Sequence, residues 1–322
     1  MPENTLKEKT AKGLMWGTIS NGAQLVLGTL FGIFLARILS PSDYGMVGLL
    51  TVFSQIASVL QDSGFRTALA NRREIVHEDY NAVFWFNVGT SCVMYLLLFF
   101  LAPLITEFYQ HSDAAANQDL SELTPLARFS FLGFVIASLG TAHYAYLFRT
   151  LQVKQKAIIT VISLTTSSTI GLTMALKGYA YWGLATQGIA FTTCNTILFW
   201  YFSKWRPTLP VSFHPLKEMF GFSSKLLAND ICNNINGNIL SVMLGRFYAV
   251  HDVGLYNQAN KWTSMVSTMV LGTIKDVAQP VLRNVETERE RHKRVFRKML
   301  RFNAFMVFPA LFGLALISRE LI

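Results

Sequence analysis

Long apolar stretches, separated by short polar gaps, recur along nearly the whole chain. They lie at about 13–36, 44–65, 80–106, 123–147, 157–176, 182–202, 219–244, 255–279 and from 302 onward. Each has roughly 20 residues or more, the length that a helix needs to cross about 30 Å of hydrocarbon. The stretches are continuous rather than alternating in period two, which excludes a transmembrane β-barrel. The pattern predicts an all-α polytopic membrane protein.

Positive charge collects at the N-terminus and in every second gap. The N-terminus carries Lys7, Lys9 and Lys12, and residues 283–301 form the richest gap, whereas the gap at 107–122 holds acids and no Lys or Arg. Basic segments stay on the cytoplasmic side of a membrane. We therefore expect a multi-pass membrane protein with its N-terminus in the cytoplasm. The net charge of +9 then reflects orientation and does not indicate nucleic-acid binding.

A short pattern occurs twice. Arg37, Asp43 and Gly45 recur as Arg246, Asp252 and Gly254, 209 residues later (246 − 37), each before an apolar stretch. At this offset Asn21 pairs with Asp230, Gln24 with Asn233 and Arg66 with Lys275. Repeated halves within apolar sequence are typical of transporters.

We interpret the pattern as two parallel six-helix repeats, alike in orientation because six is an even number of spans. The repeats give a first lobe over 1–204, a cytoplasmic linker over 205–216 with three prolines, and a partial second lobe of about three helices over 217–322. The second copy would end near about residue 420 if it were complete. We therefore expect a C-terminally truncated fragment of a longer protein, non-functional by itself.

Polar side chains concentrate in the stretch 219–244. At 3.6 residues per turn, Asn229, Asn233 and Asn236 share one helix face, and Asp230, Asn234 and Asn238 share the neighbouring face. Polar groups at membrane depth line a cavity or bond to other helices, and both alternatives stay open here. Lys225 and Asp230 indicate either a functional site or a mutual ion pair. Asn21 and Gln24 repeat the pattern more weakly, and we expect the two stripes to face one another across a cavity.

The sequence offers little that is typical of catalysis. It lacks a paired-His metal signature, a phosphate loop and a nucleophile elbow. Cys92, Cys194 and Cys232 have neither metal-site nor redox spacing. We therefore predict no catalytic residues, no metal and no cofactor.

Three segments resemble a known family: "LARILSPSDYGMVGL", "QDSGFRTAL" and "LGRFYAVHDVGLYNQANKW". They are similar to Wzx-type flippases of the multidrug/oligosaccharidyl-lipid/polysaccharide exporter (MOP) superfamily. The resemblance implies a V-shaped, two-lobe transporter. It also implies alternating-access transfer of undecaprenyl-pyrophosphate-linked oligosaccharide across the inner membrane, for lipopolysaccharide or other surface polysaccharide biosynthesis. It implies a cationic cavity as well, for which Lys225, Lys261 and Arg66 are the candidates.

Other functions remain open at this stage. An ion-coupled drug or cation antiporter of the same fold would use acids, with Asp230 as the ion-coupling candidate. A membrane glycosyltransferase or polymerase is less favoured, and residues 286–301 could instead recruit glycan enzymes as a scaffold. The expected partners are the lipid-linked oligosaccharide and membrane lipids, with a polysaccharide polymerase or glycosyltransferases as further candidates.

Overall fold

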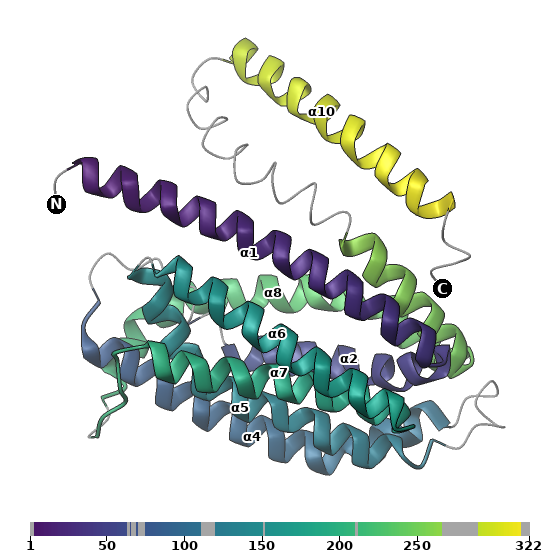
Figure 1. Cartoon of the computed structure of the whole chain (residues 1–322). Helices are drawn as coiled ribbons and strands as arrows, with labels where there is room; N and C mark the ends of the chain where they lie inside the picture. Colours follow the sequence, from purple (N-terminus) through teal and green to yellow (C-terminus); the bar gives the residue numbers. More distant parts are fainter. Residues whose placement is uncertain are drawn as a thin grey trace. The chain divides into compact units, whose positions relative to one another are not determined.

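The computed structural model describes residues 3–62, 65, 69, 75–110, 120–150, 152–209, 212–265 and 289–316. These residues form two compact units, Met1–Gly254 and Leu255–Ile322. The helices of the first unit are α1 (Glu3–Ile38), α2 (Pro41–Asp62), α4 (His77–Gln110), α5 (Leu123–Arg149), α6 (Val153–Leu176), α7 (Ala180–Phe202) and α8 (His214–Phe247) (Figure 1). A helix over residues 250–265 follows, and α10 (Arg289–Leu316) belongs to the second unit. The predicted all-α architecture is confirmed.

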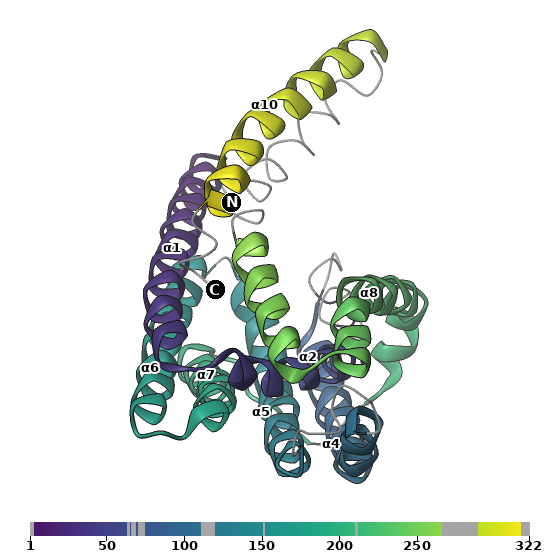
Figure 2. The ribbon, with the colours of Figure 1, turned by 90° about the vertical axis from the view of Figure 1, so that its right-hand side faces the viewer.

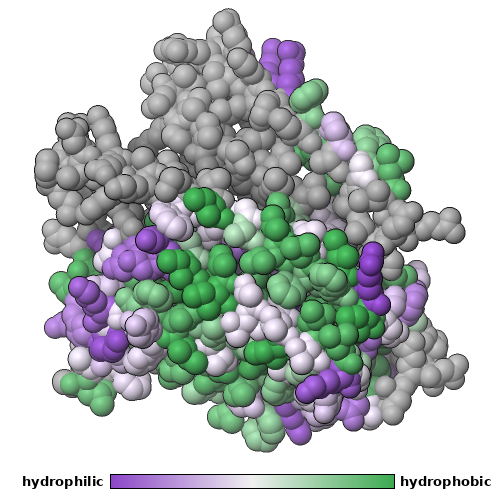
Figure 3. All heavy atoms as spheres, in the orientation of Figure 1, coloured by the Kyte–Doolittle hydropathy of each residue, from purple (hydrophilic) through white to green (hydrophobic). Residues whose placement is uncertain are grey.

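Five of the described helices are long and apolar enough to cross a membrane. These spans are Ile19–Ile38, Pro41–Leu60, His77–Gln110, Leu123–Arg149 and Val153–Leu176. On the face of the first unit that Figure 3 shows, apolar side chains cover much of α6 and α7, and polar side chains gather toward the ends of these helices. A multi-pass membrane protein follows from these spans.

The first six predicted stretches correspond one to one with α1, α2, α4, α5, α6 and α7. The structure differs from the sequence interpretation near the C-terminus, which treats the basic gap at 283–301 and the apolar stretch from 302 onward as separate segments. One continuous helix, α10, instead covers Arg289–Leu316. The junction between Arg301 and Phe302 holds neither Gly nor Pro, so no local signal ends the helix there.

Helix α2 is central to the first unit. It contacts α4, α5, α7 and α8, while α6 packs between α1 and α7. The apolar core around α2 contains Leu49, Leu50, Tyr109, Leu123 and Phe131. Figure 2 shows α1 and α6 on one side of α2 and α8 on the other. Helix α8, which the sequence places in the second lobe, therefore packs within the first compact unit against α2 and α4. The lobe boundaries remain a prediction.

The turn within each copy of the repeated pattern has the same two backbone hydrogen bonds. Before α2, Leu39 N donates to Leu35 O at 2.9 Å and Asp43 N donates to Ser40 O at 3.0 Å. After α8, Tyr248 N donates to Leu244 O at 2.8 Å and Asp252 N donates to Ala249 O at 2.9 Å. Donors and acceptors correspond at the offset of 209 residues, so the two segments adopt the same local structure.

The repeated glycines pack against one another. A Cβ atom at Gly45 would overlap the carbonyl oxygen of Val250, and one at Gly254 would overlap the carbonyl oxygen of Pro41. Pro41 and Val250 are themselves 209 residues apart, so the contact is reciprocal. The start of α2 and the start of the helix over 250–265 thus cross at a distance that only glycine permits.

We predict that Gly45→Ala and Gly254→Ala each destabilise the protein by about 1–3 kcal/mol, because the added methyl group would displace backbone rather than a flexible side chain. Thermal unfolding in detergent, followed by tryptophan fluorescence, measures the effect. Gly22→Ala is the matched control, since a Cβ there meets no atom within 4 Å and alanine favours the helix. Equal unfolding temperatures for all three variants would contradict the reciprocal crossing.

Candidate functional site

One face of α8 forms an exposed polar stripe. Lys225, Asn229, Asn233 and Asn236 follow one another at spacings of three or four residues, so they lie along one side of the helix. All four are exposed. We call these four residues the α8 stripe. Bare amide side chains facing hydrocarbon would be costly, so this face suits contact with water or a polar solute.

The neighbouring face of α8 packs against the protein. Asn238 Nδ2 donates to Gln55 Oε1 of α2 at 2.7 Å. Further along, Ser241 is buried, and a Cβ at Gly245 would lie 2.7 Å from Cε1 of Tyr109. Small and amide residues are those that hold membrane helices together. Asn238 is therefore the amide of α8 that binds α2, whereas the amides of the α8 stripe are exposed.

Asp230 lies on α8 beside the stripe. It is exposed, and its Oδ1 accepts a weak hydrogen bond from Asn229 Nδ2 at 3.4 Å. Among the hydrogen bonds and ion pairs of the described residues, none joins Lys225 to Asp230. The possible mutual ion pair is thus not formed.

Of the remaining predicted residues, Asn21 and Gln24 lie on α1. On α1, Gln24 Nε2 donates to the carbonyl oxygen of Ser20 at 3.2 Å and to its Oγ at 3.1 Å, while Asn21 is exposed. Lys261 belongs to the second unit, where its side chain is exposed and its Nζ lies 6.0 Å from the ring centre of Trp262. Arg66 lies outside the described residues.

Sequence reasoning missed a polar pocket of about 300 Å³ among α2, α5 and α7. Polar groups from all three helices line it, with aromatic rings between them. The lining comprises Ser58, Ala137, Gly140, Thr141, Tyr144, Phe191, Thr192, Asn195, Thr196 and Phe199. The hydroxyl hydrogens of Thr141, Thr192 and Thr196 are donated to backbone carbonyl oxygens. The lining oxygens can still accept hydrogen bonds from the hydroxyl groups of a sugar.

A lysine from α6 adds positive charge at one end of the pocket. Lys156 Nζ donates to the hydroxyl oxygen of Tyr144 at 3.0 Å. The same ammonium lies 4.2 Å from the ring centre of Tyr144 and 4.8 Å from that of Phe148. These contacts hold the charge beside the pocket. In the sequence, Lys156 is one of the basic residues of the gaps that indicate membrane orientation. A signal for the pocket was present as well, because polar or small residues recur three or four apart on 137–144 and 192–196, which form two of its walls.

Helix α2 joins the two polar regions. Gln55 accepts the hydrogen bond from Asn238 of α8, and Ser58, three residues further along α2, lines the pocket. Residues three apart on a helix are neighbours on its surface. The pocket and α8 therefore flank the same segment of α2.

Comparison with protein families gives a match over most of the chain. The family described as "polysaccharide biosynthesis protein" matches residues 34–322. The lipopolysaccharide biosynthesis protein WzxC of Escherichia coli (strain K12) is 29% identical over 99% of this chain and 63% of its own length. The succinoglycan biosynthesis transport protein ExoT of Rhizobium meliloti (strain 1021) is 26% identical over 96% of this chain and 61% of its own length. The chain thus spans less than two thirds of these relatives.

Solved structures share the fold at low sequence identity. An inward-facing multidrug resistance transporter of the MATE family, in the MOP superfamily, aligns with a TM-score of 0.65 and 15% identity, over 93% of this chain and 71% of its own. The lipid II flippase MurJ in an inward closed conformation gives a TM-score of 0.62 and 15% identity, over 95% of this chain and 66% of its own. The chain therefore shares its fold with these polytopic membrane transporters.

We predict that Gln55 and Asn238 are energetically coupled by about 0.6 kcal/mol and by no more than about 1.7 kcal/mol, the range found for hydrogen bonds between membrane helices. A double-mutant cycle with Gln55→Ala and Asn238→Ala, read from unfolding in detergent, measures the coupling. Asn233→Ala paired with Gln55→Ala provides the comparison, because Asn233 lies on the exposed face. Equal coupling for both pairs would contradict the division of α8 into a packed and an open face.

Proposed function

Because this chain belongs to the polysaccharide biosynthesis protein family, we propose that it forms part of a flippase for lipid-linked oligosaccharide. The substrate is an undecaprenyl-pyrophosphate-linked glycan, moved from the cytoplasmic to the outer leaflet of the bacterial inner membrane. Two names among the similar proteins support transport of this kind: one relative is a biosynthesis transport protein, and one structural neighbour is a lipid II flippase. The proposed role is movement of the lipid across the membrane rather than chemical conversion.

The observation that carries the proposal is the placement of polar groups on both sides of α2, between apolar helices. A pocket of about 300 Å³ is at the lower limit for small-molecule sites. It accommodates one sugar or one phosphate group, not a whole oligosaccharide. The exposed α8 stripe provides further amides on the other side. A chain of sugars would exchange hydrogen bonds with these groups in succession.

Two lysines are placed to meet a pyrophosphate group. Lys156 lies beside the pocket through its bond to Tyr144, and Lys225 begins the α8 stripe. Lys156 lies in the first turn of α6, and Lys225 lies in the first half of α8. Both helices begin after basic gaps, which we assign to the cytoplasmic side together with the N-terminus. Ammonium groups attract phosphate oxygens strongly where water is scarce. We propose that Lys261 and Arg66 add to the same positive field.

Alternating access would use the reciprocal crossing at Gly45 and Gly254. Close contact without interlocking side chains allows two helices to pivot while they stay in register. We propose that the two repeats rock about this contact, with the lobes at 1–204 and 217–322 and the linker at 205–216. A polymerase or glycosyltransferases would deliver or receive the glycan as partners.

A drug or cation antiporter is the second candidate function, and one observation favours it. Asp230 is exposed beside the α8 stripe and forms no ion pair with Lys225, so its carboxylate is open to a cation. In a flippase, the same carboxylate would be the site of the coupling ion.

We predict that Lys156→Gln and Lys225→Gln each lower the rate of lipid-linked oligosaccharide transfer about tenfold, as expected for the loss of about 1.4 kcal/mol of charge-assisted binding. Transfer across proteoliposomes containing the intact protein measures the rate. Lys177→Gln is the control, because Lys177 is exposed at the turn after α6. Unchanged transfer in both site variants would contradict the proposal. Uptake of a cationic dye that requires Asp230, without glycan transfer, would establish the antiporter.

A further inference from the structure

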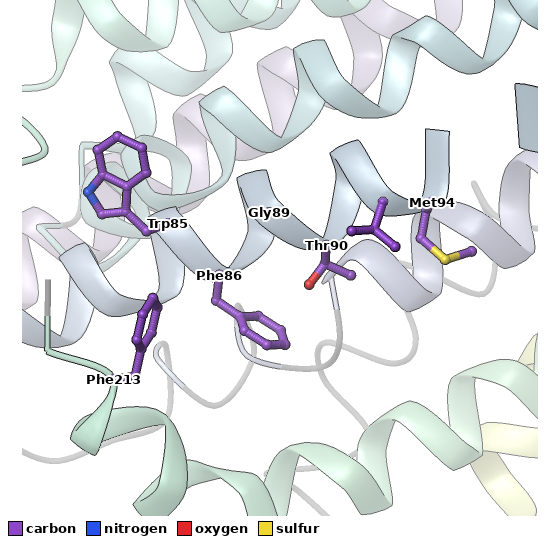
Figure 4. A pocket seen from close by; sticks show the side chains of 7 residues that line it. Trp85, Phe86, Gly89, Thr90, Met94 and Phe213 are labelled. Carbon is purple, nitrogen blue, oxygen red and sulfur yellow. The ribbon is translucent and has the colours of Figure 1, made fainter. Parts of the chain in front are cut away.

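A second cavity lies on α4, away from the polar pocket. It is a groove of about 400 Å³ lined by Trp85, Phe86, Gly89, Thr90, Val93, Met94 and Phe213. Figure 4 shows Phe86, Thr90 and Met94 following one another along α4, with Phe213, just before α8, approaching the Trp85 end. The lining is apolar apart from the Thr90 hydroxyl and the indole nitrogen of Trp85.

The floor of the groove is open because of a glycine. A Cβ at Gly89 would meet no atom within 4 Å, and the neighbouring Val93 is 63% exposed. An apolar concavity of this kind on a membrane helix faces hydrocarbon. The lipid chains around the protein are therefore the molecules with direct access to it.

The length of the groove matches one leaflet. From Trp85 to Met94, at 1.5 Å per residue, α4 rises about 14 Å. This is close to half of the roughly 30 Å hydrocarbon core. One acyl chain of a phospholipid would occupy the groove from the headgroup level to the middle of the bilayer, whereas an undecaprenyl chain would extend well beyond it.

The Trp85 end of the groove is the headgroup end. Trp85 Nε1 donates to the carbonyl oxygen of Thr208 in the segment between α7 and α8, at 3.3 Å. A tryptophan with an apolar ring and a bonded indole N–H is typical of the membrane interface. Asn81, one turn earlier on α4, also fixes this segment, because its side chain forms hydrogen bonds of 2.9 and 3.0 Å with the backbone of Thr208. The segment before α8 thus lies at the boundary between lipid and water.

Charged groups near this end favour an anionic headgroup. Lys204, Arg206 and Lys217 are exposed, and Glu78 is the exposed acid at the start of α4. Asp79 is buried and accepts a hydrogen bond from Val76 N at 3.0 Å, so it caps α4. Lys217 follows Phe213 by four residues at the start of α8, so it projects from the same side of that helix. Among these described side chains, three exposed cations accompany one exposed acid, which is the arrangement that attracts anionic lipid.

We propose that this groove binds one acyl chain of an anionic phospholipid of the cytoplasmic leaflet, with Lys217 next to its phosphate. The lipid would fill the space over Gly89 and connect α4 to the segment before α8. This site is separate from the polar pocket and does not depend on which substrate the protein transports.

Titration of the purified intact protein with phosphatidylglycerol, followed by native mass spectrometry, tests the proposal. Gly89→Leu places a side chain in the groove and lowers phosphatidylglycerol binding about tenfold, which corresponds to the loss of contact with about two methylene groups. Gly188→Leu is the matched control, since Gly188 is also exposed on a helix and a Cβ there meets nothing within 4 Å. Lys217→Gln reduces the preference for phosphatidylglycerol over phosphatidylcholine.

The wild-type protein provides an independent measurement if Gly89→Leu does not fold. Phosphatidylglycerol with a photoactivatable group on its acyl chain should label the peptide that contains residues 85–94. Labelling elsewhere, or equal binding by Gly89→Leu and Gly188→Leu, would overturn the proposal. Undecaprenyl phosphate that displaces the label from this peptide, where excess phosphatidylglycerol does not, would assign the groove to the transported lipid and overturn it as well.

Discussion

The close approach of two backbone segments at Gly45 and Gly254 is the constraint on which the rest of the structure depends. Gly45 of α2 faces the carbonyl oxygen of Val250, the first residue of the helix over 250–265. Gly254 of that helix faces the carbonyl oxygen of Pro41, the first residue of α2. Side chains of any size would separate the two helices. Their contact sets where α2 begins, and α2 in turn contacts α4, α5, α7 and α8. The polar pocket and the packed residue Asn238 of α8 both lie against this same helix α2.

Polar groups at membrane depth are arranged in two ways around α2. Some are used for packing: Asn238 binds Gln55, and Thr196 Oγ1 donates to the carbonyl oxygen of Ile136 at 3.0 Å, joining α7 to α5. Others are left exposed, as along the α8 stripe. Hydrocarbon penalises the second kind. Their presence beside the packed kind is therefore the physical argument for a transport route, and it is independent of the family relationship.

The spans and the repeated turn could be predicted from the sequence because both are local. Apolar length defines a span, and two backbone hydrogen bonds recur in the two turns at the offset of 209 residues. The pocket could not be predicted in this way. Thr192 bonds to the carbonyl oxygen of Gly188 within its own helix, and Asn195 bonds to that of Phe191. In the sequence, these residues cannot be distinguished from other polar helix residues, because the pocket forms only where α2, α5 and α7 pack together. The two faces of α8 were predicted, but only Gln55 decides which of them packs. The cationic roles of Lys261 and Arg66 remain predictions.

The proposed route for a polar substrate requires that the exposed amides of α8 face water rather than lipid. Cysteine accessibility measures this directly, after Cys92, Cys194 and Cys232 are replaced by serine in the intact protein. Asn233→Cys should react with a membrane-impermeant maleimide. Val93→Cys, which is exposed on the apolar groove of α4, should react only with a lipid-soluble one. If Asn233→Cys behaves like Val93→Cys, the α8 stripe lies in hydrocarbon, and the proposed route for a polar substrate does not exist.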